Sequence, residues 1–191
     1  MEKPQGYDEA QALTGEYETL EAGGYICKII AAKEEKSKTN KKMLVLALDI
    51  AEGEKKDFFK KRFEENKKNN TDPTKEIKWP AGGTYRQMLE GDKSVGYLKG
   101  LMTSLENSNP NFKWDWDEKK LKNLKCGAIF GEEEYEKMDG SIGTTTKIKF
   151  IRTVEAIKEG KFKIPEIKKL IQKGEAFDDF ATDVQNDDLP F

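Results

Sequence analysis

Apolar residues in the first part of the chain recur in a pattern that predicts β-strands. Residues 25–32 (YICKIIAA) are mostly apolar and rich in β-branched side chains, and two glycines precede them. In residues 42–51 every second position is apolar, which places one set of side chains on a single face: Leu44, Leu46, Leu48 and Ile50. Because the polar and basic residues 33–42 join the two segments, the pattern predicts a β-hairpin with a basic loop.

Residues 57–63 (DFFKKRF) predict a third strand that mixes aromatic and cationic side chains on both faces. Alternation divides its side chains into two sets, namely Phe59, Lys61, Phe63 and Phe58, Lys60, Arg62. Two interpretations are open. In the first, one phenylalanine set fills the core and the cationic side chains extend past the core to solvent. In the second, the rings of one face stack on the bases of a nucleic-acid strand while its cations contact the phosphates.

Residues 64–80 form a long polar segment, which predicts a loop with a functional role. Trp79 lies among its lysines, and Tyr85 and Arg86 follow, so aromatic and basic residues alternate. The pattern then becomes helical over residues 85–107, with an apolar set at helical spacing: Val95, Leu98, Met102 and Leu105. Gly96 and Gly100 on this helix could allow close packing against the sheet.

The second half of the chain predicts two more strands and a second helix. Strands are expected at residues 125–135 and 142–154, with Asp139-Gly140 as the hairpin turn between them. The alternation in the last strand directs Lys147 and Lys149 outward, where they could contact phosphates. Trp114 and Trp116 are expected to fill the core. Pro165 is placed to open a helix that Gly174 closes.

This order of elements predicts the fold class and the domain organisation. A mainly β protein is expected, with a five-stranded antiparallel OB-fold barrel and a helix between the third and fourth strands. We expect an N-terminal lead-in at residues 1–19, the OB domain at residues 20–160, a C-terminal helix at residues 161–174 and an acidic tail at residues 175–191. An exposed edge strand could pair with a second copy of the chain or be covered by the lead-in, so a homo-oligomer is one open possibility.

The amino-acid composition excludes several classes of catalytic and metal-binding site. The chain has 191 residues and no histidine, so catalytic triads and histidine metal ligands are excluded. Its two cysteines, Cys27 and Cys126, are expected to be buried thiols in a reducing compartment. No apolar run is long enough to cross a bilayer, and residues 1–10 lack the apolar core of a secretory signal. We therefore expect a cytoplasmic protein that does not contact a membrane and uses no cofactor.

The distribution of charge sets the last segment apart. The whole chain has 34 basic and 36 acidic residues, a net charge of −2. Six of the acids lie in residues 175–191, so residues 1–174 hold 34 basic against 30 acidic residues, a net charge of +4. The tail is either a solubilising terminus or a peptide ligand whose apolar tip suits a hydrophobic pocket with a basic rim. Its expected partner-binding residues are Asp187, Asp188, Leu189, Pro190 and Phe191.

Several longer blocks of sequence carry a resemblance to a known family. They are residues 21–25 (EAGGY), 49–53 (DIAEG), 114–119 (WDWDEK), 130–135 (FGEEEY), 163–165 (KIP) and 187–191 (DDLPF). With these blocks the chain resembles the small single-stranded-DNA-binding proteins of phages and prophages of Gram-positive bacteria over about residues 20–191. The resemblance implies an OB-fold, a non-catalytic role in covering exposed DNA strands in the bacterial cytoplasm, and an acidic tip that recruits replication or recombination proteins.

These features lead to one main hypothesis for function. A basic groove would follow the phosphates of single-stranded DNA while aromatic rings stack on bases with little sequence preference. The candidate stacking residues are Phe58 or Phe59, Trp79 and Tyr85, and the candidate phosphate contacts are Lys60, Lys61, Arg62, Arg86, Lys147 and Lys149.

Two alternatives belong to other classes. A metal-dependent nuclease would use acid-x-Lys triplets such as those at residues 34–36 and 65–67, although short triplets arise easily by chance in a chain with 37% charged residues. A non-enzymatic replication or recombination accessory factor would instead use the aromatic residues to contact proteins. We expect a binding protein and not an enzyme.

Overall fold

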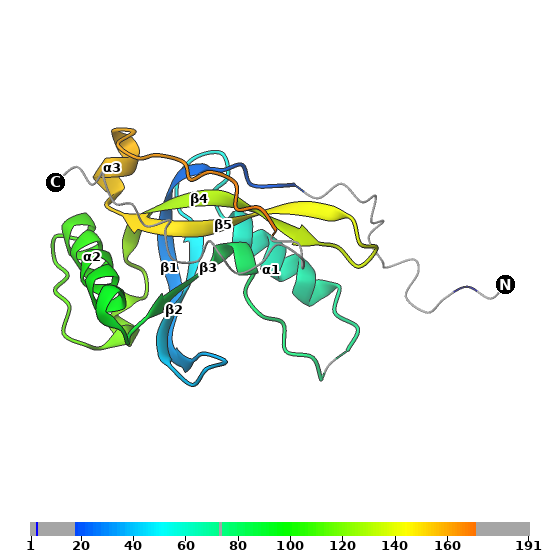
Figure 1. The fold of residues 1–191 in the computed structure, drawn as a ribbon, viewed down its shortest axis with the longest axis horizontal. Coiled ribbons are helices and arrows are strands. Elements are labelled where there is room, and N and C mark those ends of the chain that lie inside the picture. Colours follow the sequence, from blue (N-terminus) through cyan, green and yellow to red (C-terminus); the bar gives the residue numbers. More distant parts are fainter. Residues whose placement is uncertain (1–2, 4–17, 73, 171–191) are drawn as a thin grey trace, which may run out of the picture.

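The computed structural model describes residues 3, 18–72 and 74–170, and its centre is a single antiparallel sheet (Figure 1). The five strands are β1 (Gly23–Lys36), β2 (Lys42–Ile50), β3 (Thr84–Met88), β4 (Lys125–Glu136) and β5 (Ile142–Arg152). They lie in the order β3-β2-β1-β4-β5, and every neighbouring pair is antiparallel. The predicted mainly β class and five-stranded antiparallel sheet are therefore confirmed.

In the described part of the chain, three α-helices lie between or after the strands. Helix α1 (Phe58–Lys68) lies between β2 and β3, α2 (Asp92–Ser108) between β3 and β4, and α3 (Val154–Lys158) follows β5. Two short 3₁₀ helices, η1 (Ala81–Gly83) and η2 (Glu118–Leu121), complete the described elements. The predicted helix between the third and fourth strands is confirmed as α2.

The core lies on one face of the sheet. The predicted apolar face of β2 is buried, and so are the thiols of Cys27 and Cys126, which are free and occupy opposite positions on β1 and β4. Burial raises the pKa of the Cys126 thiol to about 12, so the thiol is kept protonated. Helices and neighbouring strands supply further side chains, including Phe59, Leu101, Leu105, Leu121 and Phe130.

The third strand predicted at residues 57–63 is wrong, because this segment forms the start of α1. Phe58 and Phe59 are only 7% and 2% exposed, and Phe63, four residues after Phe59, lies half-buried on the same side of the helix. The Asp49 carboxylate on β2 accepts a hydrogen bond of 2.9 Å from the Phe59 backbone N–H near the start of this helix. The i, i+4 spacing of the rings and the helix-favouring residues that follow outweigh the short alternation.

The third strand of the sheet is instead β3, which begins where a helix was predicted. The helix was predicted over residues 85–107, but α2 begins only at Asp92 and ends at Ser108. Leu98, Met102 and Leu105 pack inward as expected, but Val95 is 55% exposed. Added Cβ atoms at Gly96 and Gly100 would meet no atom within 4 Å, so these glycines do not pack closely against the sheet.

The two tryptophans of residues 114–119 differ in their surroundings. Trp114 is partly buried and packs against the core as predicted. Trp116 is 77% exposed, so its predicted core position is wrong. The short capped turn that follows is η2, where the Asp117 side chain accepts a hydrogen bond from the Lys119 backbone N–H.

The segment after α3 runs back along the outer side of β4 and β5 (Figure 1). Lys168 pairs with β4 through two backbone hydrogen bonds, from Lys168 N–H to the Glu132 oxygen (3.0 Å) and from Glu134 N–H to the Lys168 oxygen (2.9 Å). The helix predicted from Pro165 is therefore wrong for residues 165–170, which are extended. Residues 171–174, the acidic tail and most of the lead-in lie outside the described residues.

None of the helices in the described ranges combines the length and apolar composition that a membrane span needs.

Candidate nucleic-acid interface

The outer surface of the sheet has two halves with different surroundings. Over β1, β4 and β5, the segment after α3 lies against the sheet: a Cβ at Gly24 would be 2.5 Å from the Phe162 ring, and one at Gly131 would be 3.3 Å from Pro165. The other half consists of the outward side chains of late β1, β2 and β3. We call it the β2–β3 face, and its residues are Ala31, Lys33, Glu35, Met43, Val45, Ala47, Thr84, Arg86 and Met88.

A row of three paired residues crosses the β2–β3 face. Lys33 on β1 is opposite Val45 on β2, and Val45 is opposite Arg86 on β3. Neighbouring strands lie about 4.8 Å apart, so the Lys33 and Arg86 backbones are separated by roughly 10 Å. Both cationic side chains are exposed, and Val45 between them is buried. The row therefore places two exposed cations on either side of a buried apolar residue.

The charge of this face is net positive. Glu35 forms an ion pair of 2.5 Å with Lys33, and this hydrogen bond is the largest cause of its lowered pKa. The charges of Arg86 and Lys78 lower the same pKa further, so both cations lie close enough to act on Glu35. Lys33, Arg86 and Lys78 against Glu35 leave an excess of positive charge that suits a polyanion.

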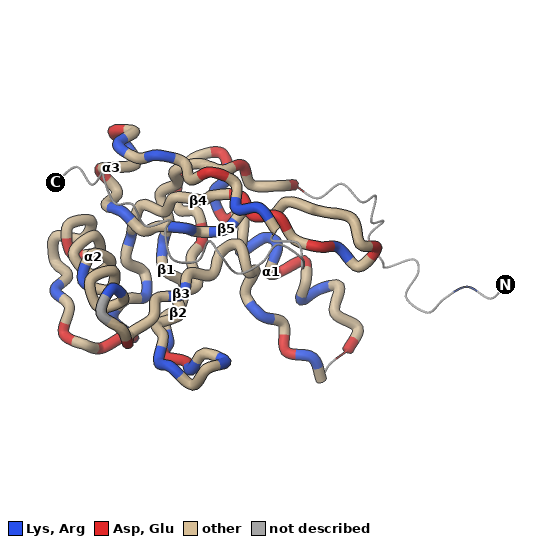
Figure 2. The backbone as a smooth tube through the Cα atoms, in the orientation of Figure 1, with Lys and Arg blue, Asp and Glu red and all other residues tan. Residues whose placement is uncertain are grey.

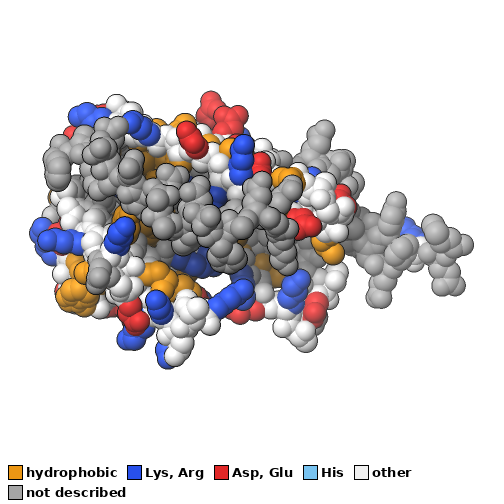
Figure 3. Space-filling model, viewed as in Figure 1, with side chains coloured by type: hydrophobic (Ala, Val, Ile, Leu, Met, Phe, Trp, Pro, Cys, Tyr) orange, Lys and Arg blue, Asp and Glu red, His pale blue; other side chains and the backbone are white. Residues whose placement is uncertain are grey.

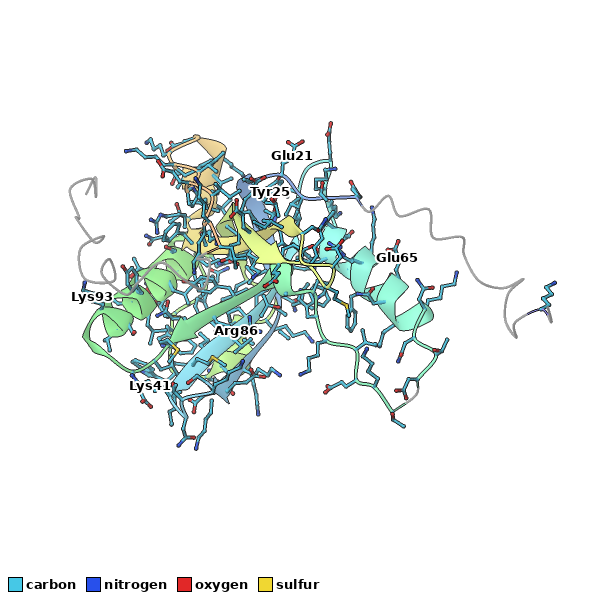
Figure 4. The ribbon with its side chains drawn as sticks, turned by 45° about the vertical axis from the view of Figure 1, so that its right-hand side comes forward. Glu21, Tyr25, Lys41, Glu65, Arg86 and Lys93 are labelled. Atoms are coloured by element: carbon cyan, nitrogen blue, oxygen red, sulfur yellow. The ribbon has the colours of Figure 1, made fainter. Side chains whose placement is uncertain are left out.

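Lysine-rich loops border the face on two sides. The β1–β2 hairpin loop carries Lys36, Lys38, Lys41 and Lys42, and the segment from late α1 to η1 carries Lys67, Lys68, Lys75 and Lys78. Figure 2 shows basic positions along both loops. In Figure 3, Lys and Arg side chains gather near the centre of the view and toward the β1–β2 hairpin, beside hydrophobic side chains. Figure 4 places Arg86 between the hairpin, which carries Lys41, and helix α1, which carries Glu65.

Two aromatic rings lie beside each other where α1 meets the loop that leads to β3. The Trp79 and Phe63 ring centroids are 5.2 Å apart, and the Lys67 ammonium lies 5.2 Å from the centre of the Phe63 ring. The Trp79 Nε1–H donates a hydrogen bond of 3.1 Å to the Leu48 carbonyl oxygen, which fixes the indole against β2. Both rings are half-buried, so they are held rigidly and keep part of their surface in solvent.

The other predicted stacking residues point into the protein. Phe58 and Phe59 pack edge to face, and Phe59 stacks on Phe130 in the core at 5.9 Å between ring centroids. Tyr85 packs against the core, and its hydroxyl donates a hydrogen bond of 3.2 Å to Gln87. These three rings are not placed to stack on bases.

The predicted phosphate contacts divide among three places. Arg86 lies on the β2–β3 face. The cations of residues 57–63 lie exposed on α1, and they are Lys60, Lys61 and Arg62. Lys61 acts on the pKa of Glu18, beside Lys55, so it lies near the N-terminal end of the described chain. The predicted grouping of Phe59, Lys61 and Trp79 on one barrel face is therefore not found.

Lys147 and Lys149 lie on the other half of the outer surface. Their ammonium groups bind the Glu133 carboxylate at 2.6 and 2.5 Å. Burial disfavours the charge on Glu133, but the hydrogen bonds and charges of the two lysines outweigh burial and lower its pKa to about 2. The two lysines are neutralised in part by this carboxylate, and they lie on β5, whereas Arg86 lies on β3.

Lys33, Lys78 and Phe63 are members of the site that the sequence alone did not single out. Lys78 directly precedes Trp79 in the chain, so its position beside a predicted stacking residue could have marked it as a member of the site. Lys33 faces outward beside Arg86 only because the pairing of β1 with β2 shifts between Ile29 and Ala31. No local pattern marks that shift.

The acid-x-Lys triplets do not converge on one site. Residues 34–36 lie on β1, where successive side chains alternate between faces, and residues 65–67 lie on α1. Within the described ranges, no three Cys, Asp or Glu side chains are grouped as metal ligands would be.

Neither protein-family models nor the sequences of curated proteins yield a match to this chain.

Proposed function

We propose that this protein binds single-stranded DNA with little sequence preference through the β2–β3 face. The observation that carries the proposal is the cross-strand row in which Lys33 and Arg86 flank Val45, with Lys78 nearby. Cations spaced along a sheet surface can contact successive phosphates of a nucleic-acid strand. Such contacts do not distinguish one base from another. The resemblance of residues 20–191 to phage single-stranded-DNA-binding proteins supports the same reading.

An OB-type barrel is part of the proposal. The strand order leaves β3 and β5 as the two edges of the sheet, which are the strands that meet when an OB barrel closes. The short helix η1 lies between them, because a Cβ at Gly82 would be 2.7 Å from the Thr146 carbonyl oxygen on β5. OB folds bind oligonucleotides across the face of strands 2 and 3, which matches the position of the cationic row.

Rings at the edge of the face would supply the base contacts. Phe63 and Trp79 are the described aromatic pair beside the lysines of the 67–78 segment. Stacking contributes about 1–3 kcal/mol per base and does not depend on which base is present. The lysines of the β1–β2 hairpin would close over the strand as a flexible second set of phosphate contacts.

The acidic tip belongs to the proposal as a recruiting element. Asp187, Asp188, Leu189, Pro190 and Phe191 lie outside the described residues, so the support for this role is their composition and the family resemblance. In phage DNA replication or recombination, the protein would cover and protect the strand while its tip binds replication or recombination proteins.

Fluorescence anisotropy of a labelled oligothymidylate at several salt concentrations tests the DNA-binding step. We expect saturable binding, with the logarithm of the affinity falling linearly with the logarithm of salt concentration by ~0.7 for each phosphate contact. Oligomers of different base composition should bind within about tenfold of one another. Absence of binding at low salt, or binding whose affinity does not change with salt, would refute the proposal.

A further inference from the structure

A separate pocket opens between α2, the β1–β2 hairpin and the residues that precede η2. Its apolar lining comes from Leu44, Leu89 and Leu98. Its volume is about 160 Å³, similar to that of an engineered apolar cavity of ~150 Å³ that accommodates one benzene molecule. The pocket therefore has room for the end of one flat side chain together with part of its aliphatic stem.

Two tryptophans form one wall of this pocket. The Trp114 and Trp116 ring centroids are 5.8 Å apart, and the ring planes are inclined by 58°. The Glu106 carboxylate accepts a hydrogen bond of 2.9 Å from the Trp114 backbone N–H, which ties the wall to α2. Trp116 has a φ of +69°, which is unfavourable for a bulky residue. A strained backbone that holds a large ring in solvent is a pattern found at binding sites.

The rim of the pocket is acidic. Glu34 and Glu118 line it, and the described lining residues include no lysine or arginine. Glu34 forms an ion pair of 3.2 Å with Lys42. Glu118 takes part in none of the ion pairs between residues that the structure describes. Carboxylates beside exposed indole faces attract a cation and repel the phosphates of a nucleic acid.

The pocket is on the opposite side of the hairpin from the β2–β3 face. Glu34 is paired with Leu44, whose side chain points to the core, while the next residue, Glu35, is paired with Met43 on the β2–β3 face. A ligand in the pocket and a strand on the β2–β3 face would therefore occupy different surfaces.

We propose that this pocket binds an arginine side chain presented by a partner protein. The planar guanidinium stacks on the Trp116 ring and forms an ion pair with Glu118, and its methylene stem packs on the leucine lining. Arginine fits better than lysine because its delocalised, weakly hydrated group both stacks on aromatic rings and pairs with carboxylates.

Titration of the full chain with n-butylguanidinium, followed by the indole N–H resonances in NMR spectra, tests the proposal. The neutral isostere n-butylurea is the matched ligand control, and the Trp79 indole is the internal control. We expect the Trp114 and Trp116 resonances to shift with the cation and to respond at least about threefold more weakly to the urea. Equal responses to both ligands, or no response to either, would overturn the proposal.

Two variants separate the contributions of ring and charge. Trp116→Ala and Glu118→Gln should each weaken n-butylguanidinium binding by about threefold or more, while Glu136→Gln on β4 should leave it unchanged. Since Trp116→Ala could disturb the fold, Glu118→Gln, which preserves shape and removes only charge, is the deciding variant. Unchanged cation binding by Glu118→Gln would contradict the proposed ion pair.

A nucleotide titration distinguishes a base pocket from an arginine pocket. Deoxycytidine monophosphate should not shift the Trp114 and Trp116 resonances, and a shift by this nucleotide without one by n-butylguanidinium would overturn the proposal. Glu118→Gln should bind oligothymidylate as tightly as the unmodified chain. Loss of DNA binding in both proteins would count against the proposed function and would leave the pocket result standing.

Discussion

Asp49 on β2 accepts a hydrogen bond of 2.9 Å from the backbone N–H of Phe59, ten residues further along the chain. The same carboxylate oxygen accepts a second hydrogen bond of 2.9 Å from the Ile50 N–H. Asp49 is 2% exposed, and burial outweighs these hydrogen bonds, so its pKa is raised. This buried acceptor joins the end of β2 to the start of α1 and fixes the direction in which the helix leaves the sheet.

Removal of this acceptor should destabilise the protein. Asp49→Ala leaves the Phe59 N–H without its acceptor and should cost about 1–3 kcal/mol in the free energy of unfolding, measured by urea denaturation. Asp49→Asn retains one carbonyl oxygen of the same shape and should cost less. If the two variants lose the same stability, or neither loses any, the hydrogen bond does not have the role assigned to it.

Two glycines, Gly24 on β1 and Gly100 on α2, should respond to alanine in opposite directions. A Cβ at Gly24 would lie 2.5 Å from the Phe162 ring, so Gly24→Ala should displace the segment after α3 and cost about 1–3 kcal/mol. A Cβ at Gly100 meets no atom within 4 Å, and Gly100→Ala should stabilise α2 by about 0.5–1 kcal/mol.

Thermal unfolding and limited proteolysis of residues 161–170 measure these effects. Gly24→Ala should increase cleavage in this segment, and Gly100→Ala should not. Unchanged proteolysis in Gly24→Ala would show that Phe162 can move aside without releasing the segment.

A local pattern predicts an element correctly where the side chains of that element determine its structure. Alternation over Leu44, Leu46, Leu48 and Ile50 locates β2 correctly because its inner face is uniformly apolar. In residues 57–63 both the strand and the helix pattern fit, but the i, i+4 spacing of Phe59 and Phe63 and the residues up to Lys68 favour the helix. Asp49 on β2 then joins this helix to the sheet through the Phe59 N–H. Residues 165–170 are not helical, and Lys168 among them pairs its backbone with β4, a contact that the composition of the segment does not encode.

The site was less predictable than the fold for a related reason. Arg86 and Trp79 could be selected by residue type, but Lys33 joins Arg86 only through the register of three strands and the irregularity between Ile29 and Ala31. A shift of one residue reverses which face every later side chain occupies. Phe58 or Phe59 was predicted to stack on bases, yet both are buried in the core because their burial stabilises the fold more than solvent contact would.

The free energy of unfolding should decrease at acidic pH because Glu133 becomes protonated there. Burial alone would raise its pKa, but Lys147 and Lys149 lower it from an ordinary value of 4.5 to about 2. Because the pKa is lower in the folded than in the unfolded chain, the stabilisation is complete above about pH 4.5 and is lost as the pH falls toward 2.

Glu133→Gln should therefore be less stable than the unmodified chain by about 1–2 kcal/mol near neutral pH, after allowance for solvent screening. The difference should shrink as the pH is lowered through this range. Urea denaturation at a series of pH values measures it, and Glu136→Gln, at an exposed position on the same strand, is the control. A difference that is independent of pH would point to lost packing and not to lost charge.

The cationic row on the β2–β3 face should determine DNA affinity, whereas the lysines held by Glu133 should not. Arg86→Gln removes an exposed cation from the face. We expect it to weaken oligothymidylate binding by about three- to tenfold at moderate salt and to reduce the salt slope by ~0.7, the value of one phosphate contact on a single strand. Lys33→Gln should have a smaller effect, because Lys33 already forms an ion pair with Glu35.

Lys147→Gln is the matched control, since it removes one positive charge from the same sheet but from the half that carries Glu133. Fluorescence anisotropy at several salt concentrations should give this variant the affinity and salt slope of the unmodified chain. If Lys147→Gln and Arg86→Gln weaken binding equally, DNA follows a path over both halves of the sheet, and the β2–β3 face is not the specific interface. If only Lys147→Gln weakens binding, the strand lies on the β4–β5 half, and the assignment of the site is wrong.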